Sequence, residues 1–182
     1  MNNPWKTKSK EIKYSNNWIA IEHHEVITPA GTDGVYGVIH FKNTAIGIIP
    51  LDDENNTWIV GQYRYPIDEY SWEIPEGGGP KEKDPLESAK RELLEETGII
   101  AQQWEMIQRV HLSNSASDEV GLIYIARGLR FSHAEPEETE DLMIKKIHVT
   151  ELIKKVDNGE ITDSLSVMAA LHLKIRLLEG NL

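Results

Sequence analysis

Residues 77–99 constrain the fold of this chain more than any other stretch, because they carry the signals for the start, the buried face and the end of one helix. Asp84 can cap a helix that begins at Pro85, and Gly98 lies where such a helix would end. Glu87 is placed to complete a capping box with Asp84. Apolar residues recur at helical spacing between these signals, and they are Leu86, Ala89 and Leu93. The sequence therefore predicts an amphipathic helix whose apolar face lies on a sheet.

Three glutamates, Glu92, Glu95 and Glu96, lie close together on the surface of this predicted helix, since they are three and four residues apart. Each like-charged pair costs roughly 0.2 to 0.5 kcal/mol unless a positive charge compensates. A divalent cation would compensate, and oxygen ligands in a chain without cysteine select Mg2+ or Mn2+. The alternative is a solvated acidic helix face that is stabilised by neighbouring Lys and Arg.

The segment Arg91-Glu92-Leu93-Leu94-Glu95-Glu96-Thr97-Gly98-Ile99, with Gly77 before it, resembles the Nudix box of the Nudix hydrolases. One signature position departs, because the first glutamate of the signature falls on Lys83. That glutamate generally has a supporting role in the family. We therefore expect the change to affect the charge network around Arg91 more than the activity.

The resemblance implies an α/β Nudix fold, in which a mixed β-sheet is sandwiched between α-helices. It also implies a metal site at Glu92 and Glu96, with Glu95 supporting catalysis and the Gly77 backbone carbonyl as a further ligand. The expected cofactor is Mg2+, with Mn2+ as a possible substitute.

Composition predicts one domain over residues 1–182, because this length and 40% hydrophobic residues suffice for a core. No apolar run approaches the roughly 20 residues of a membrane helix, and residues 1–4 begin no signal peptide. The absence of cysteine fits a reducing cytoplasm, which is the expected location. A net charge of -11 argues against a nucleic-acid partner, although bound cations can invert the local potential that a phosphate compound meets.

Residues 6–14, 18–27 and 35–41 read as three short strands, which predicts an antiparallel β-meander over residues 1–41 ahead of a Nudix core at 42–182. Residues 45–51 and 58–65 are more continuous apolar runs, and we expect both in the central sheet. Three further strands are predicted at 104–112, 121–126 and 142–149.

Two helices are predicted near the end of the chain, at residues 150–157 and from Asp163 or Ser164 to Leu178. The second has a broad apolar stripe that includes His172. We interpret His172 as a core or rim histidine rather than a ligand.

Residues 61–65 and 71–77 resemble the approach to the box in the ADP-ribose and nucleoside-diphosphate-sugar pyrophosphatases of this family. That resemblance places Arg64 and Glu73 near the substrate, although an arginine at a strand end is commonly a surface or ion-pair residue. Residues 113–119 form a polar loop that in this branch lies near the second half of the substrate, which implicates Ser115 and Glu119. The alternative is an ordinary loop.

The predicted meander carries apolar residues that need a partner surface. The sugar-diphosphate branch commonly forms dimers through this region, so the resemblance implies a homodimer with exchanged N-terminal strands. Trp18 or Tyr36 would then stack on the substrate base.

An acidic segment at residues 132–141 is expected to be exposed and mobile, as a catalytic lid would be. Box carboxylates that hold a cation are poor proton acceptors, so the base should lie elsewhere. Glu138 and Glu140 are two residues apart and point the same way in an extended chain. Related enzymes keep a metal ligand and a base in this loop. We assign Glu140 the closer position, as ligand or base, and Glu138 the other role; the alternative is a solvated acidic loop.

These features together predict metal-dependent hydrolysis of the diphosphate in a nucleoside diphosphate sugar, with ADP-ribose as the archetype. A Nudix hydrolase for dinucleoside polyphosphates or nucleoside triphosphates would share the box. A catalytically silent module that binds a nucleotide ligand is the third possibility, and the intact box counts against it.

Overall fold

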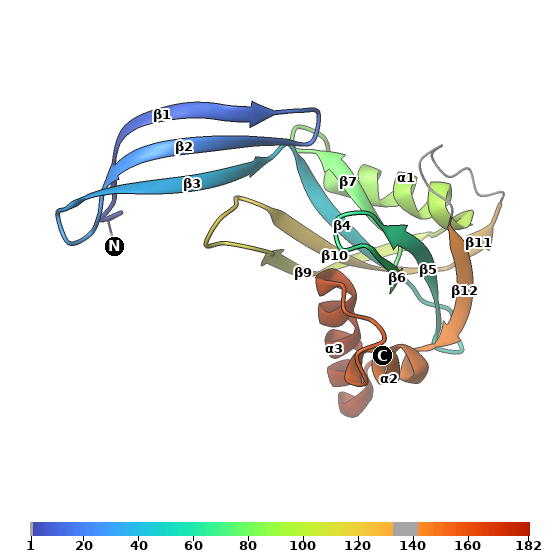
Figure 1. Cartoon of the computed structure of the whole chain (residues 1–182). Helices are drawn as coiled ribbons and strands as arrows, with labels where there is room; N and C mark the ends of the chain where they lie inside the picture. The colour runs from blue at the N-terminus through green and yellow to red at the C-terminus, as the bar shows by residue number, and fades with distance from the viewer. Residues whose placement is uncertain (1, 133–141) are drawn as a thin grey trace.

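The computed structural model describes residues 2–132 and 142–182. Its first element is a three-stranded antiparallel sheet in the order β1-β2-β3. The strands are β1 (Lys6–Ser15), β2 (Ile19–Ile27) and β3 (Asp33–Phe41). This sheet extends to one side of the other elements (Figure 1). The structure confirms the predicted meander.

A four-stranded mixed sheet forms the centre of the fold, in the order β7-β4-β10-β9. Its strands are β4 (Asn43–Pro50), β7 (Glu76–Pro80), β9 (Gln103–His111) and β10 (Val120–Arg127). Strands β4 and β10 are parallel, and the other two pairings are antiparallel. A short ladder joins β8 (Ile99–Ile100) to β11 (Arg130–Phe131).

A second, antiparallel sheet has the order β12-β5-β6. It consists of β5 (Asn56–Arg64), β6 (Glu69–Glu73) and β12 (Met143–His148). The prediction that residues 45–51 and 58–65 share the central sheet is therefore wrong, because β4 and β5 lie in different sheets. An apolar run indicates a buried strand but carries no information about which strand pairs with it.

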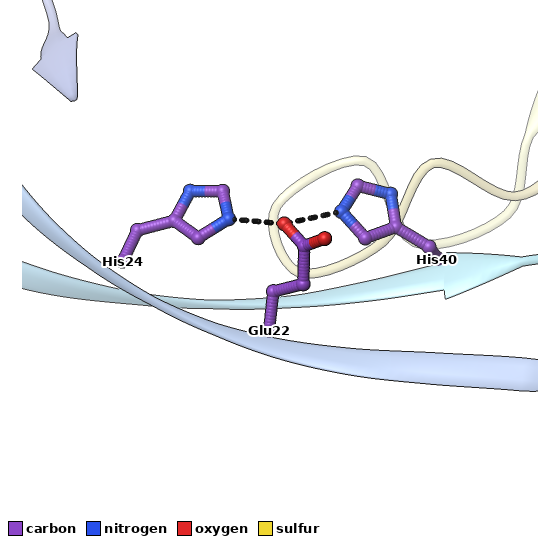
Figure 2. A group of neighbouring side chains, drawn as sticks. All are labelled: Glu22, His24 and His40. Atoms are coloured by element: carbon purple, nitrogen blue, oxygen red, sulfur yellow. Dashed lines mark hydrogen bonds and ion pairs between the residues drawn. The ribbon is translucent and has the colours of Figure 1, made fainter. Parts of the chain in front are cut away.

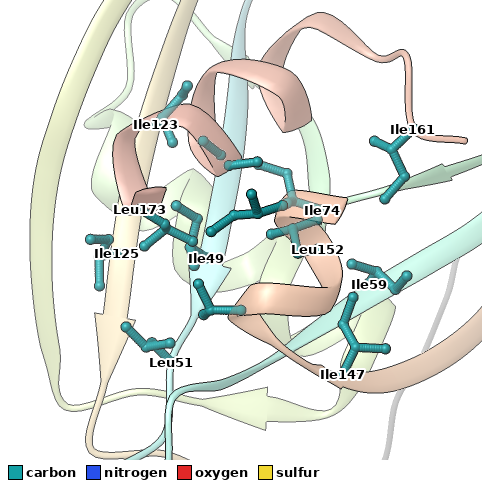
Figure 3. Close-up of a cluster of buried hydrophobic side chains, with 14 of the residues drawn as sticks. Ile49, Leu51, Ile59, Ile74, Ile123, Ile125, Ile147, Leu152, Ile161 and Leu173 are labelled. Carbon is teal, nitrogen blue, oxygen red and sulfur yellow. The ribbon is translucent and has the colours of Figure 1, made fainter. Parts of the chain in front are cut away.

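The mixed sheet lies between helices, as predicted. Side chains alternate along β4 and β10, so that Ile46, Ile48, Leu122 and Tyr124 face the cluster that contains Ala89 and Leu93 of α1 (Pro85–Thr97). The alternate residues, which include Ile49, Ile123 and Ile125, face the cluster that contains Leu152 and Leu173 (Figure 3). These two leucines come from α2 (Val149–Asp157) and α3 (Ser164–Glu179). The apolar face predicted for the first helix is thus buried on the sheet.

His172 lies half-buried on α3, where its Nε2 accepts a hydrogen bond of 2.9 Å from Arg176 Nε. Burial and the positive charge of Arg176 lower the pKa of His172. The structure therefore confirms a rim histidine.

The longest helix in the described residues, α3, has 16 residues, and none of these helices is long and apolar enough to cross a membrane.

Candidate active site

Helix α1 begins and ends where its sequence signals predict. Asp84 Oδ1 accepts a hydrogen bond of 3.0 Å from the Leu86 amide. Gly98 adopts a left-handed conformation with φ of 68°, and its amide donates to Leu94 O at 2.8 Å. The Glu87 carboxylate instead pairs with Lys90 Nζ at 2.7 Å, so only the Asp84 half of the predicted capping box is formed.

The three glutamates of the box differ in burial. Glu92 is 8% exposed and Glu96 only 1%, whereas Glu95 is half-buried. Glu96 Oε2 accepts a hydrogen bond of 3.0 Å from the Glu76 amide, which joins α1 to the start of β7. Burial excludes the alternative of a solvated acidic face for Glu92 and Glu96, because buried carboxylates need compensating partners.

Arg91 connects the carboxylates of this cluster. Its guanidinium donates to Glu92 Oε1 and to Glu95 Oε2, both at 2.5 Å, and to Gly78 O at 3.1 Å. Burial lowers the pKa of Arg91, but Glu92 and Glu95 outweigh it and raise this pKa above its usual value. Lys83 is exposed, and its amide donates to Pro80 O at 3.0 Å. The charge network around Arg91 thus forms without a glutamate at position 83.

Gly77 lies directly against the Glu92 carboxylate. A methyl group at Gly77 would overlap the carboxylate carbon and both of its oxygens. The site therefore brings a backbone and buried carboxylates into contact, and the ligands that the described residues offer there are all oxygens. Hard cations such as Mg2+ and Mn2+ prefer this ligand type, so the residues fit the cofactor that the box implies.

A hollow of about 460 Å³ adjoins the box at Gly77. Residues from the meander, both core sheets and the loop before β10 line it, and they include Trp18, Phe41, Arg64, Glu76, Gly77 and Glu119. The structure thus brings together three of the predicted substrate residues, Trp18, Arg64 and Glu119. The side chain of Trp18 is available to a planar ligand, because this residue is 66% exposed.

A second hollow, of about 440 Å³, shares Arg64 and Glu76 with the first. Arg64 Nε donates to both Glu73 oxygens, at 3.0 and 3.1 Å, and Arg64 Nη2 donates to Glu76 Oε1 at 2.8 Å. Glu73 is itself buried and lines the second hollow. Arg64 is therefore an ion-pair residue, as the alternative interpretation held, and it also lines both hollows.

Sequence reasoning missed Glu76 and Asp163, which meet in this second hollow. Burial, Asp163 and Glu73 raise the pKa of Glu76 well above its usual range, against the opposing effect of Arg64. The position of Glu76, directly before Gly77 in the sequence, could have placed it at the site. Asp163 was predicted as a helix cap without a role in the site, and it does accept the Ser166 amide at 2.8 Å.

Tyr36 and Ser115 lie together but line neither hollow. The Tyr36 hydroxyl donates to Ser115 O at 2.6 Å, and its ring meets Trp5 edge-on at 5.4 Å. The polar loop is docked on the meander, because the Ile39 amide donates to Ala116 O at 2.9 Å. Glu138 and Glu140 fall outside the described residues.

Two family models match the chain. The NUDIX domain matches residues 41–163, which include the box and most of the core. The nucleoside diphosphate sugar hydrolase N-terminal domain matches residues 5–39, which are the meander. A solved structure titled "Crystal structure of ADP compounds hydrolase" shares the fold, with a TM-score of 0.86 and 18% identity over 98% of this chain and 97% of that one.

Three curated relatives align along most of their length. The ADP-ribose pyrophosphatase of Mycobacterium tuberculosis is 31% identical over 92% of this chain and 82% of its own length. The ADP-ribose pyrophosphatase of Bacillus subtilis is 28% identical over 94% of this chain and 93% of its own length. The methanol dehydrogenase activator of Bacillus methanolicus is 30% identical, also over 94% and 93%. The chain therefore belongs to the Nudix family, as a Nudix pyrophosphatase with the N-terminal domain of the nucleoside diphosphate sugar hydrolases.

Proposed function

We propose that this protein hydrolyses the diphosphate linkage of a nucleoside diphosphate sugar, with ADP-ribose as the favoured substrate. The products are a nucleoside monophosphate and a sugar phosphate. One observation carries the proposal: the buried pair Glu92 and Glu96 adjoins, at Gly77, a hollow lined by Trp18 and Arg64. The names of two relatives and the match of the N-terminal domain support the substrate class.

Glu92, Glu96 and the Gly77 carbonyl would hold Mg2+ or Mn2+, with Glu95 supporting. When bound, the cation neutralises the diphosphate and orients water toward one phosphorus. The chain itself contributes orientation. Trp18 offers a stacking surface for a base, and Arg64 is held in place beside the hollow by Glu73 and Glu76.

Water forms a bond to one phosphorus, the bond from that phosphorus to the bridging oxygen breaks, and the water proton passes to a base. We assign the base to Glu140 or Glu138, because carboxylates engaged with a cation are weakly basic. Glu138→Gln and Glu140→Gln separate these roles. A base variant loses turnover but binds metal normally, a ligand variant needs more metal, and two variants with wild-type behaviour would remove both residues from the mechanism.

A substrate panel tests the proposed specificity. Purified protein with Mg2+ would be given ADP-ribose, other nucleotide sugars, dinucleoside polyphosphates and nucleoside triphosphates, with a phosphatase to release phosphate from monoester products. We expect the highest kcat/KM with a nucleotide sugar. A preference for polyphosphates would overturn the substrate class, and tight binding of ADP-ribose without products would favour the silent binding module.

The lack of cysteine fits our further proposal that the enzyme works in the cytoplasm. A small-molecule substrate requires neither a nucleic-acid partner nor a membrane.

A further inference from the structure

Two histidines and a glutamate converge on one face of the meander, away from the box. Glu22 and His24 lie two residues apart on β2, so their side chains share a face of the sheet. His40 of β3 pairs in register with Ala20, which puts it on the same face. Figure 2 shows both imidazole rings directed at the Glu22 carboxylate from opposite sides. Glu22 Oε2 lies 2.7 Å from His24 Nε2 and 3.2 Å from His40 Nε2.

His24 and the Nε2 atom of His40 are shielded from solvent, whereas Glu22 and the rest of His40 are half-buried. His24 is only 8% exposed, and His40 Nε2 is buried without a hydrogen bond of good geometry despite its short distance to Glu22. The nearest lysine, Lys10, makes only a long ion pair with the cluster, since its Nζ lies 3.9 Å from Glu22 Oε2. A buried ring nitrogen needs a polar partner, and a cation bound between the carboxylate and the two imidazoles would supply one for His40 Nε2.

Asp118 fixes the orientation of His40. Its Oδ2 lies 2.9 Å from His40 Nδ1, and its Oδ1 accepts the Phe41 amide at 2.9 Å. When Nδ1–H donates to Asp118, the neutral ring presents the lone pair of Nε2 to the cluster. Histidines that bind metals commonly have such a carboxylate on their other nitrogen.

We propose that Glu22, His24 and His40 bind a divalent transition metal ion of the Zn2+ class, at a site separate from the box. Imidazole nitrogens with one carboxylate suit Zn2+, whereas the oxygen ligands of the box suit Mg2+. The three ligand atoms lie within 4.8 Å of one another. A tetrahedral zinc site with bonds of about 2.0–2.1 Å separates its ligand atoms by about 3.3 Å, so only small side-chain shifts are needed.

The site would have a structural role. The metal would tie β2 to β3, and Asp118 would extend this tie to the loop before β10, which the meander already contacts. The inference does not rest on the proposed hydrolysis, because none of the three ligands lines either hollow beside the box.

Calorimetric titration of metal-free protein with Zn2+ tests the site directly, in excess Mg2+ so that the box carboxylates are occupied. We expect one Zn2+ per chain and at least a tenfold loss of affinity in His24→Gln and in His40→Gln. His23→Gln is the matched control, since His23 adjoins His24 but points to the opposite face of β2, and its affinity should equal that of the wild type. No Zn2+ binding, or wild-type binding by both ligand variants, would overturn the inference.

Thermal unfolding gives a second readout. Zn2+ should raise the Tm of the wild type and of His23→Gln but not of His24→Gln, because a ligand stabilises only the state that binds it. If a histidine variant fails to fold, Glu22→Gln can replace it, because this change keeps the side-chain shape. Glu22→Gln should also lose the Tm shift. Asp118→Asn should weaken Zn2+ by about 10- to 100-fold, as expected for a residue that positions a ligand. An equal Tm shift in all these variants would place the Zn2+ elsewhere and contradict the site.

Discussion

At the scale of single residues, the Gly77 backbone lies so close to the Glu92 carboxylate that no side chain fits between them. Gly77→Ala should therefore displace Glu92 and lower turnover by about a hundredfold, the loss expected when a catalytic group moves by about 1 Å. Gly37→Ala is the matched control, because no atom lies within 4 Å of the added methyl. Steady-state kinetics on both variants, with thermal melts to verify folding, make the comparison. Wild-type turnover in Gly77→Ala would show that this contact has no part in catalysis.

Asp52 predicts a pH dependence of stability. Burial raises its pKa, but Lys146 and hydrogen bonds from Asn56 and Glu54 outweigh this and lower the pKa from 3.8 to about 2. Because the folded pKa is the lower one, the stabilisation is complete above pH 3.8 and is lost as the pH falls from there toward 2. The shift corresponds to about 2 kcal/mol.

Asp52→Asn should therefore lower the free energy of unfolding by about 1 to 2 kcal/mol at pH 7 and by progressively less below pH 4. Urea unfolding across this range measures the difference. Asp53→Asn, at the exposed neighbouring position, should show no such trend. A constant difference between the wild type and Asp52→Asn at all pH values would contradict the assignment.

Local spacing predicted the carboxylates of the box, because residues three and four apart on a helix are neighbours in any fold. The meeting of Glu76 with Asp163 could not be predicted in this way. It depends on how the start of β7 approaches the N-terminus of α3, which is a tertiary contact between distant segments. Tyr36 and Ser115 likewise come from distant segments, and they contact each other instead of lining a hollow.

At the scale of elements, the Asp84 cap determines where α1 begins. Asp84→Ala removes the acceptor for the Leu86 amide and should lower the free energy of unfolding by about 1 kcal/mol. Glu82→Ala, two residues earlier and exposed, should change it little. Denaturant unfolding measures both variants. Equal stability of the two would mean that the cap contributes nothing to the helix.

Helices and most strands were predictable because caps and hydrophobic periodicity are local signals. Strand β7 was not, since its sequence Glu-Gly-Gly-Gly-Pro has little strand propensity and it pairs with β4 through tertiary contact. The partition of β4 and β5 between two sheets has the same cause. Pairing is a property of the assembled chain rather than of either segment.

At the scale of the whole molecule, the meander exposes large apolar side chains. Ile12, Tyr14 and Val35 are 61%, 52% and 64% exposed in the single chain. We propose that a second copy covers them in a homodimer with exchanged N-terminal strands, in which residues of the partner's meander complete each active site.

Light scattering coupled to size exclusion tests this assembly. The wild type should have the mass of a dimer, and Ile12→Lys should shift it toward the monomer. Leu178→Lys changes an equally apolar residue that is 81% exposed on α3, far along the chain from the meander, and should remain a dimer. A stable wild-type monomer with full activity would be incompatible with the proposal.

The dependence of ADP-ribose turnover on Mg2+ tests the central claim most directly, in the wild type, Glu92→Gln, Glu96→Gln and the control Glu87→Gln. Glu87 lies on the same helix but pairs with Lys90 at its surface. We predict no turnover without Mg2+ or Mn2+, and a loss of at least about a hundredfold in the two box variants, the scale of removing one preorganised stabilising group. Both box variants should still fold, although Glu92→Gln loses its ion pair with Arg91 and should be slightly less stable. Glu87→Gln should match the wild type in turnover. Wild-type turnover by Glu92→Gln or Glu96→Gln at saturating metal would contradict the account.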